Sequence, residues 1–523
     1  MINPPFFRLM EVFLKVNQKI KKIFCISWQD TVYLLFHQYY LKLFINMKMN
    51  RKSFLKIAGL AALGSVVKTK ASNITHYLDN HAQTFNMHGY SAPKLDKVRV
   101  GFVGVGSRGS GTVIRLASIE GVEVRALCDQ LPARVNSSLE FLRKEFPGHN
   151  PITYSGSGEA WKKACEQEDI DLIYIATPWK LHAQIAIYAM EHGKHVYTEL
   201  PVGITVEECW DVVATSEKTR KHCYMGCGSA HDGISAVVLN MARQGLFGDI
   251  IHGEGHYIHD RVSDNKVRWE RDKKNNSWFG YRPWRLQENV NRNGNLYPAH
   301  GLGPVSQIMD INYGDKMDYL VSISSDDFTM TNKMQEMSEI DSYYEPYKGL
   351  KFRGNLNTTI IRTHRGRTIM LQHDISTPRP QHRFDLISGN KGIYRAEPDR
   401  IAINSEKWLP EQEFNALVEK YTPEILKRFE DKRKQAGQGH GSRSYEQVAV
   451  SDWRLIDCLR NGLPLEMDVY DAALWSVITP LSEWSVANQG ATIQVPDFTN
   501  GAWKTNKRGM DVSLQHGGTT NLV

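Results

Sequence analysis

The sequence predicts an α/β protein with an N-terminal doubly wound parallel sheet and a C-terminal α+β domain that carries an open, mostly antiparallel sheet. Three observations predict this fold: a strand–turn–helix–strand unit near residue 100, strands that alternate with helices up to residue 225, and successive strands beyond residue 235. A chain of 523 residues is too long for one core. We therefore expect two folded domains with extensions.

The first element is an apolar strand, Val98–Val103, that runs directly into Gly104-x-Gly106-x-x-Gly109 and a helical pattern. A second strand ends beside Asp129. This order is the dinucleotide-binding (Rossmann) fingerprint, in which the glycines permit a tight turn, approach of a pyrophosphate and close packing of helix on strand. Asp129 would accept hydrogen bonds from a ribose 2′-OH, which favours NAD over NADP.

The first domain is expected to span residues 97–230. Its later strands are predicted at Asp171–Ala176, Gly193–Tyr197 and His222–Met225, and its helices at Ala183–His192 and Val206–Thr219. The apolar character of these strands is typical of a parallel sheet covered on both faces. Ligands of such sheets bind at the carboxyl ends of the strands.

The second domain is expected to span residues 231–510, followed by a tail at 511–523. Alternating polarity predicts a strand at Gly248–His259, and Arg261–Asn295 has the character of a long loop over a site. Further strands are expected at Tyr319–Ser324, Asn357–Thr363, Thr368–Asp374 and Arg383–Ser388, and helices at Val237–Leu246, Glu411–Gly437, Ser451–Arg460 and Val469–Ala487.

The N-terminus combines three segments. Residues 49–72 resemble an export signal, with basic Arg51-Lys52 before an apolar stretch too short to remain as a membrane span. The pattern is similar to a twin-arginine signal with lysine at the second position, so we expect an exported, periplasmic protein. Residues 1–48 are interpreted as a non-native extension, with translation starting at Met49 or Met47, and 73–96 as a linker.

Charge and cysteine content exclude several other classes of protein. The formal net charge of +7 is modest for this length, and no nucleic-acid-binding motif accompanies it. Cys223-x-x-x-Cys227 lacks the second pair that a zinc site needs, so no metal site is expected. The expected partner is a small molecule or glycan.

A nucleotide domain followed by an open-sheet domain resembles the glucose–fructose oxidoreductase/inositol dehydrogenase (Gfo/Idh/MocA) family. Most members of that family carry Glu-Lys-Pro after the fifth strand, where the lysine meets the reacting hydroxyl. This chain has Glu199-Leu200-Pro201. A leucine cannot shuttle a proton, so ordinary dehydrogenase chemistry lacks one of its parts.

Longer stretches are similar to glycoside hydrolase family 109, the NAD-dependent α-N-acetylgalactosaminidases, over roughly residues 97–510. They include Arg243–Gly248, Tyr257–Asp260, Arg292–Pro304 and Asp452–Gly462, and the family also has an apolar residue at the Leu200 position. The resemblance implies a redox-assisted mechanism, in which NAD⁺ takes hydride from C3 of the sugar, the glycosidic oxygen leaves by elimination, water adds, and the hydride returns.

The resemblance also implies site residues. Those for the cofactor are Ser107, Arg108 and Asp129 with the glycines of the fingerprint, then Trp179, His182, Glu199, Leu200, and Gly228 in place of an asparagine. Those for the substrate are Tyr257, Arg285, Tyr297, Pro298, Ala299 and His300, with Gln381 in place of a tyrosine. The catalytic candidates are His300, Tyr297, and His231, which replaces another tyrosine.

His300 is the preferred base, because an imidazole titrates near neutral pH, although a purely structural histidine is the alternative. For His182 a structural role is an equal alternative. Two other functions stay open: a net sugar or polyol oxidoreductase, and a sugar or NAD(H) binder without activity. We also expect a homo-oligomer that forms through the open sheet.

Overall fold

The computed structural model describes residues 82–230, 233–262, 269, 271–272, 277–278, 283–438 and 444–523, all within one compact unit, Tyr77–Val523. The expected extension, the export signal, the start of the linker and His231 lie outside these residues. None of the described helices is both long enough and apolar enough to cross a bilayer.

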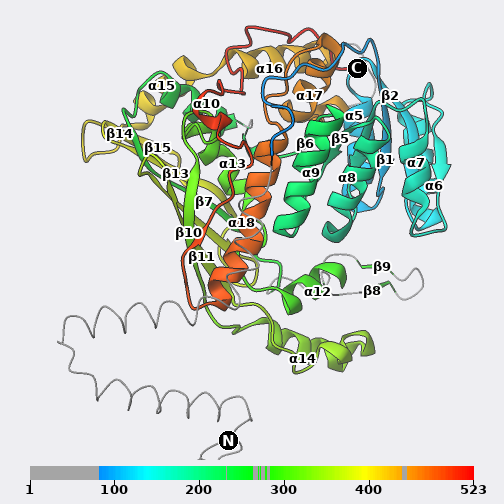
Figure 1. Cartoon of the computed structure of the whole chain (residues 1–523), viewed down its shortest axis with the longest axis horizontal. Coiled ribbons are helices and arrows are strands. Elements are labelled where there is room, and N and C mark those ends of the chain that lie inside the picture. The colour runs from blue at the N-terminus through cyan, green and yellow to red at the C-terminus, as the bar shows by residue number, and fades with distance from the viewer. Residues whose placement is uncertain are drawn as a thin grey trace, which may run out of the picture. The chain divides into compact units, whose positions relative to one another are not determined.

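The first sheet is six-stranded and parallel, in the order β3-β2-β1-β4-β5-β6 (Figure 1). Its strands are β1 (Val98–Val103), β2 (Val122–Cys128), β3 (Ile152–Tyr154), β4 (Leu172–Ile175), β5 (His195–Thr198) and β6 (Cys223–Met225). Its helices are α5 (Ser107–Ala117), α6 (Pro132–Glu145), α7 (Ala160–Glu166), α8 (His182–Glu191) and α9 (Val206–Thr219). The predicted doubly wound sheet is confirmed.

The second sheet has eight strands in the order β15-β14-β13-β7-β12-β11-β10-β16. They are β7 (Ile250–Ile258), β10 (Met317–Ser324), β11 (Leu356–Thr363), β12 (Thr368–Asp374), β13 (His382–Gly389), β14 (Gly392–Arg395), β15 (Arg400–Ile403) and β16 (Ile493–Gln494). Only β7 and β12 pair in parallel, so the expected open, mostly antiparallel sheet is confirmed.

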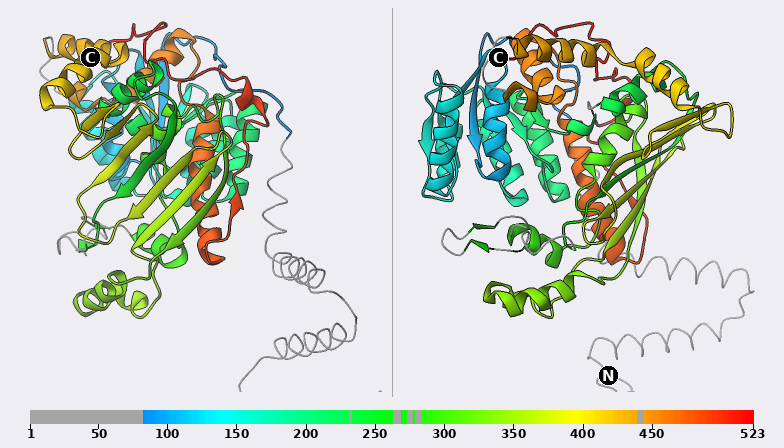
Figure 2. Two further views of the ribbon diagram at one scale, coloured as in Figure 1. Left: turned by 90° about the vertical axis from the view of Figure 1, so that its left-hand side faces the viewer. Right: turned by 180° about the vertical axis from the view of Figure 1, so that it is seen from behind.

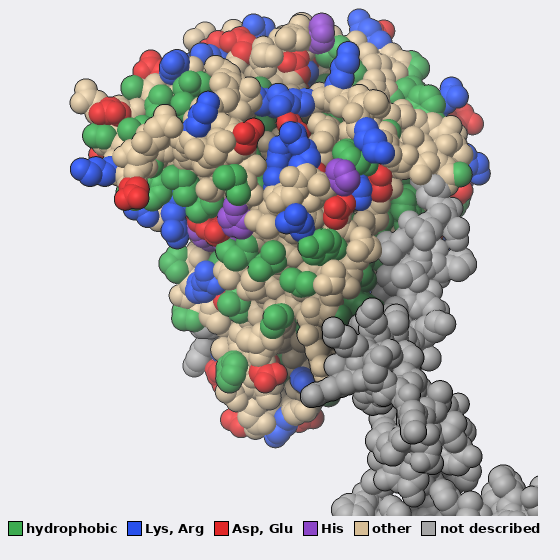
Figure 3. All heavy atoms as spheres, turned by 60° about the vertical axis from the view of Figure 1, so that its left-hand side comes forward, with side chains coloured by type: hydrophobic (Ala, Val, Ile, Leu, Met, Phe, Trp, Pro, Cys, Tyr) green, Lys and Arg blue, Asp and Glu red, His purple; other side chains and the backbone are tan. Residues whose placement is uncertain are grey.

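One face of this sheet is covered by helices and the other faces outward. Helices α13 (Ala299–Ile308) and α18 (Val469–Ala487) pack against the inner face, on β7 and β10 respectively. In Figure 2 (left) the outer face turns toward the viewer with the helices behind it. Figure 3 shows hydrophobic side chains among polar ones on this side. Ile323 and Ile360 are 68% and 45% exposed.

The C-terminal helices α17 (Val450–Asn461) and α18 connect the two sheets. Asp452 of α17 is fully buried, where its carboxylate pairs with Arg115 at 2.5 Å and accepts a hydrogen bond of 2.7 Å from the Tyr197 hydroxyl. On α18, the Ser476 hydroxyl oxygen accepts a hydrogen bond from the Val202 amide. These buried contacts fix α17 and α18 against the first domain, while α18 also packs on β10 of the second sheet.

Two element predictions need correction. The expected long loop Arg261–Asn295 contains β8 (Arg271–Asp272), β9 (Ser277–Trp278) and α12 (Pro283–Asn291), which begins at a proline, a residue well suited to the first helical turn. The single helix expected at Glu411–Gly437 is two, α15 (Glu411–Tyr421) and α16 (Glu424–Gly437), because Pro423 interrupts it.

Helices α10 and α14 also differ from the prediction. Helix α10 covers Gly233–Arg243, four residues earlier than the predicted Val237 start. Helix α14 (Met330–Ile340) was not predicted, and it buries only three methionines, Met330, Met334 and Met337. Short 3₁₀ turns occur at Trp179–Leu181, Gly228–Ala230, Ser342–Tyr347, Ser444–Gln447 and Ala502–Lys504.

Candidate functional site

The turn after β1 has the geometry of an anion-binding site. Gly104 has a φ of +91°, and a Cβ on Gly109 would lie 1.8 Å from the Gly104 carbonyl oxygen. Both positions therefore require glycine. Helix α5 starts at Ser107 without a side-chain cap on its first turn. Its main-chain N–H groups and dipole favour a negatively charged group at the carboxyl end of the sheet, so this turn fits a dinucleotide pyrophosphate.

Asp129 follows β2 at the same edge and is 7% exposed. Its Oδ1 accepts a hydrogen bond of 3.0 Å from the Leu131 amide and lies 3.5 Å from Arg134 Nη1. The Arg134 guanidinium also borders Gly106, since Nη1 would lie 3.5 Å from a Cβ there. A carboxylate held this way beside the glycine turn is suited to accept hydrogen bonds from a ribose.

A cavity of about 650 Å³ begins at this helix start and extends to the second sheet. We call the side formed by residues 107–200 the nucleotide wall, and the side formed by residues 257–383 the substrate wall. The cavity is lined by Ser107, Arg108, Ala176, Thr177, Trp179, His182, Glu199, Leu200, Tyr257, Arg261, Trp284, Arg285, Asn289, Leu296, Tyr297, His300, His373, Ile375 and Arg383.

On the nucleotide wall, Glu199 is fixed by two donors. Its Oε1 accepts hydrogen bonds from Arg108 Nε at 2.7 Å and from the Tyr174 hydroxyl at 2.5 Å. The next residue, Leu200, is 3% exposed. The carboxylate charge is thus compensated by Arg108, and the position beside it is apolar.

His182 is fully enclosed at the start of α8. Its Nδ1 and Nε2 each lie 2.7 Å from a main-chain oxygen, of Pro201 and Thr177 respectively. Burial lowers the pKa of His182. Because both ring nitrogens are engaged by the main chain, this histidine holds together the two turns that border the cavity.

An aromatic cluster joins the two walls. Trp179 stacks on Tyr297 with ring centroids 5.5 Å apart, and Trp284 meets the edge of Trp179 at 5.1 Å. The Arg285 guanidinium lies over all three rings at 4.8 to 5.4 Å. Burial raises the pKa of Tyr297 to about 12, so its hydroxyl keeps its proton. Flat rings with a fixed cation can pack on a sugar ring and bind its hydroxyls.

His300 is the second residue of α13 and stacks on Tyr257, with ring centroids 5.5 Å apart. Burial, then the charges of Arg383, Arg108 and Arg285, lower the pKa of His300 to about 3. The imidazole is therefore neutral near pH 7.

The position of His300 is set by a contact between main chains. A Cβ on Gly301 would lie 2.2 Å from the His256 nitrogen and 2.3 Å from the Gly255 carbonyl carbon, so α13 rests directly on β7. No side chain fits between them, and this contact brings His300 beside Tyr257.

The cavity brings together ten of the residues implied by the sequence, whereas the three fingerprint glycines, Asp129, Pro298 and Ala299 are not among its described lining residues. Of the predicted residues, Gln381 is exposed before β13 and is not among the described lining residues. Gly228 also lies outside the lining, although its neighbour Cys227 donates a hydrogen bond to the Ala299 oxygen. The lining adds residues that the sequence did not indicate, including Arg261, His373 and Arg383.

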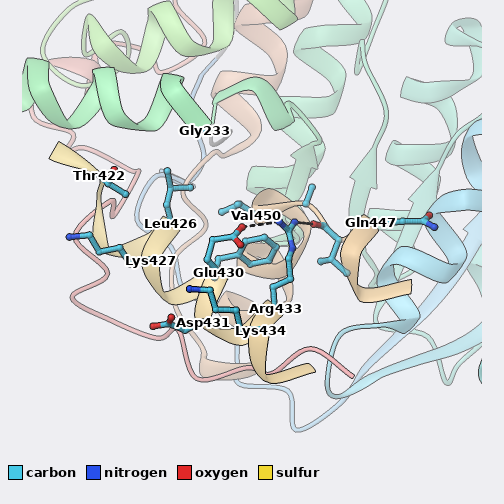
Figure 4. A pocket seen from close by; sticks show the side chains of 13 residues that line it. Gly233, Thr422, Leu426, Lys427, Glu430, Asp431, Arg433, Lys434, Gln447 and Val450 are labelled. Carbon is cyan, nitrogen blue, oxygen red and sulfur yellow. Dashed lines mark hydrogen bonds and ion pairs between the residues drawn. The ribbon is translucent and has the colours of Figure 1, made fainter. Parts of the chain in front are cut away.

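A second cavity, of about 860 Å³, lies along α16 (Figure 4). Half of its labelled residues are charged, and Arg433 pairs with Glu430 at 2.8 Å. None of the predicted site residues borders it. Its lining includes one aromatic residue, Phe429, and not the cluster of rings and buried polar groups found in the first cavity.

One cluster of metal-ligand types occurs in the described part of the chain, formed by His256, His382 and Asp385. The His256 Nδ1 accepts a hydrogen bond of 3.2 Å from the Gln372 amide, which places the proton of a neutral ring on Nε2, 3.3 Å from Asp385. A ring nitrogen that carries a proton cannot ligate a metal. This cluster is accounted for as a histidine–carboxylate pair.

Comparisons with known proteins divide the chain at the same place as the two sheets. Residues 98–227 match the family described as oxidoreductase family, NAD-binding Rossmann fold. Residues 234–505 match glycosyl hydrolase 109, C-terminal domain.

Relatives with high coverage carry related names. A glycosyl hydrolase family 109 protein of Shewanella pealeana is 41% identical over 88% of this chain and 98% of its own length. An alpha-N-acetylgalactosaminidase of Shewanella oneidensis is 39% identical with the same coverage. A Bacteroides fragilis glycosyl hydrolase family 109 protein 1 is 42% identical over 80% of this chain and 89% of its own.

Solved structures are similar in fold. A levoglucosan dehydrogenase in complex with NADH and levoglucosan has a TM-score of 0.54 at 16% identity, over 77% of this chain and all of the dehydrogenase. The apo scyllo-inositol dehydrogenase of Lactobacillus casei has a TM-score of 0.51 at 14% identity, with the same coverage.

Proposed function

The chain belongs to glycosyl hydrolase family 109, and we propose that it hydrolyses a terminal glycoside with the help of a tightly bound NAD. The proposal rests on one continuous cavity, which is bordered by the start of α5 on one side and by His300 and Tyr257 on the other. A dinucleotide and a sugar bound at these two walls would meet inside it.

The nucleotide wall supports NAD as the cofactor. The first turn of α5, with Ser107 and Arg108, would hold the pyrophosphate, and Asp129 the ribose, while Trp179, Glu199 and Leu200 would border the nicotinamide. When bound, NAD⁺ supplies reversible hydride transfer at C3 of the sugar. Leu200 offers no proton at the position beside Glu199, which disfavours net alcohol oxidation.

The substrate wall supports a sugar ligand. Arg285 and the rings of Trp179, Trp284 and Tyr297 would pack against the sugar and orient its hydroxyls. His300 is neutral, so it would accept a hydrogen bond from a reacting hydroxyl, and the main chain at Pro298-Ala299 positions it. His231 remains a proposed acid/base residue on sequence grounds.

The experiment is a panel of nitrophenyl glycosides in both anomers, with N-acetylated and free sugars, followed by absorbance of nitrophenol and of NADH. We expect nitrophenol release, with α-N-acetylgalactosaminide as the first candidate substrate, and no net NADH. Accumulation of NADH would instead identify an oxidoreductase. Binding of sugar or NAD without either signal would identify an inactive binder.

His300→Ala tests the substrate wall in the same assay. Because the variant keeps the whole nucleotide wall, we expect NAD to remain bound while turnover falls by about 10²- to 10⁴-fold. Unaltered turnover would remove His300 from the mechanism.

Export and self-association are separate proposals. The signal-like segment 49–72 supports export to the periplasm, and mass spectrometry of the native protein would reveal its start and its cleavage. Exposed Ile323 and Ile360 on the outer face of the second sheet support a homo-oligomer through that face. Sedimentation of the parent and of Ile360→Lys would test it, and identical monomeric behaviour would contradict it.

A further inference from the structure

Tyr257 lies near the end of β7, is 6% exposed and lines the cavity. Its ring lies nearly parallel to two imidazoles, of His300 at 5.5 Å and His373 at 5.7 Å, each with an interplanar angle of 17°. Tyr297 meets it edge-on at 4.7 Å. The phenol is thus held rigidly in the substrate wall.

Positive charge gathers around this phenol. The described lining residues of the cavity include four arginines and one carboxylate, Glu199, which Arg108 already engages. The other three, Arg261, Arg285 and Arg383, come from three different segments, and all act on Tyr257. The Arg383 guanidinium lies 4.1 Å from the ring centroid.

The hydrogen bond to the Tyr257 hydroxyl also favours its charged form. Arg261 hydrogen-bonds to the Tyr257 side chain, and a guanidinium can only donate. The phenol oxygen is therefore the acceptor. A hydrogen bond to the charged form of a group favours that form, so this contact stabilises a phenolate.

The neighbouring imidazoles add no charge of their own. Burial, then the charges of Arg383, Arg108 and Arg285, lower the pKa of His300 to about 3. Burial, then the charges of Arg353, Arg285 and Arg383, also lower the pKa of His373. Burial raises the pKa of Tyr257, but Arg285, Arg261 and Arg383 outweigh it and hold that pKa below the ordinary value. Tyr297 contacts Tyr257 edge-on, but there burial outweighs the nearby positive charges and raises the pKa of Tyr297 to about 12.

We propose that Tyr257 is the base of the elimination, and that it removes the proton next to the sugar carbonyl as a phenolate stabilised by Arg261, Arg285 and Arg383, which line the same cavity. This inference rests on the proposed function, which names the dinucleotide as the oxidant that creates the carbonyl. His300, with its low proton affinity, then orients the reacting hydroxyl rather than holding the proton.

The C2–H bond breaks as the O–H bond of Tyr257 forms, and the electron pair moves onto the carbonyl oxygen as an enolate. The enolate then expels the glycosidic oxygen from C1, and that oxygen takes a proton from solvent. Water then adds at C1 and releases a proton to solvent, and the Tyr257 hydroxyl returns its proton to C2, which restores the phenolate.

The first test needs no turnover. The near-ultraviolet absorbance of phenolate is followed from neutral pH upward in the full-length protein and in Tyr257→Phe, with thermal unfolding as the check on folding. We expect the parent to contain a phenol that ionises below the ordinary value of about 10, and the variant to lack it. Tyr319→Phe, half-buried on β10, is the matched control and should keep this component. Identical curves for parent and Tyr257→Phe would overturn the proposal.

The second test changes the charge around the phenol. Removing a positive charge raises the pKa of Tyr257, so Arg383→Gln should move the phenolate component, and the acidic limb of kcat/KM, to higher pH. Arg379→Gln, an exposed position four residues earlier, should move neither. If neither the acidic limb of kcat/KM nor the phenolate absorbance shifts in Arg383→Gln, the role of the guanidinium groups is contradicted.

The third test separates this proposal from the proposed function. In D₂O, the parent should exchange the C2 hydrogen of the substrate, and Tyr257→Phe should exchange it at least about 100-fold more slowly while a transient NADH signal still forms. Exchange at the parental rate in the variant would overturn the role of Tyr257. A parent without the NADH transient would instead refute the proposed function.

Discussion

The two walls of the cavity are built in different ways. The nucleotide wall is shaped by the main chain: glycine contacts at Gly104 and Gly109, and two carbonyl oxygens that hold His182. The substrate wall is made of side chains that meet from α12, α13, β7, β12 and β13. A wall made from one local turn is specified by a short motif, whereas a wall made from distant segments depends on how those segments pack.

The largest effect is expected at the nucleotide wall, with Gly109→Val. Any side chain at this position collides with the Gly104 carbonyl, and overpacking of this kind costs about 1–3 kcal/mol or more. We expect at least about a 100-fold loss of dinucleotide affinity, measured by titration or by the NAD released on denaturation.

Gly111→Ala is the matched control for this variant, in the same helix, because a Cβ there has no atom within 4 Å. We expect it to bind the dinucleotide normally. Full binding by Gly109→Val would show that the turn does not set the nucleotide wall.

The substrate wall is expected to respond to Gly301→Ala. Main-chain atoms of β7 occupy the place of the new Cβ, so α13 must shift and carry His300 away from Tyr257. Because misplacement by about 1 Å can cost 10²-fold, we expect kcat/KM to fall by about 100-fold. The NAD content should stay at the parental level, and Gly148→Ala, which has open space, should be unaffected. Loss of NAD together with activity would mean that the walls are not separable.

A smaller effect is expected for Arg285→Lys. Lysine keeps the charge but loses the planar group that lies over Trp179, Trp284 and Tyr297. The loss of about 1–2 kcal/mol of cation–π contact corresponds to about a tenfold rise in KM, measured by steady-state kinetics. Arg400→Lys breaks a similar contact with Trp408 outside the cavity and should leave KM unchanged.

The smallest effect concerns proton uptake. The pKa of His300 is about 3 in the folded protein and about 6.5 when unfolded, so the unfolded chain binds the extra proton between these values. This histidine therefore lowers stability as pH falls from about 6.5 toward 3, by about 1.4 kcal/mol per pH unit, and has no effect above that window.

The slope of the unfolding free energy with pH is proportional to the number of protons taken up on unfolding. We expect His300→Asn to lower that number by about one. His195→Asn in the first domain, whose histidine also has a pKa of about 3, should do the same. The pKa of Asp471 is raised to about 7, so this residue increases stability as pH falls. It is present in the parent and in both variants, and its effect therefore cancels in the comparison. Equal slopes in parent and variants, from denaturant titrations at several pH values, would contradict the buried neutral state.

Much of the fold could be predicted because it depends on local patterns. The boundaries Val206–Thr219, Thr368–Asp374 and Val469–Ala487 agree with the structure residue for residue. The break at Pro423 is also predictable from the sequence, because a proline disrupts the interior of a helix. Helix α14 had a weaker signal, since its buried residues are three methionines rather than a broad apolar face.

The residues of the substrate wall could be predicted from the sequence only in part. On β12, His373 lies on the same buried face of the sheet as Ile369 and Leu371, because alternate residues of a strand share a face. This alternation could have identified His373 from the sequence. Arg383 could not be found this way, because β13 shifts register on both sides of Phe384 and loses strict alternation. The crowding of three guanidinium groups on Tyr257 arises only when their segments pack together.

The direct contact of Gly255 with Gly301 has one more consequence. The backbone positions of His300 and Tyr257 are fixed by two main chains in direct contact, so the pair is held close together before any sugar arrives. Binding then needs little conformational entropy to assemble these groups, and more of the interaction free energy remains available to lower the barrier.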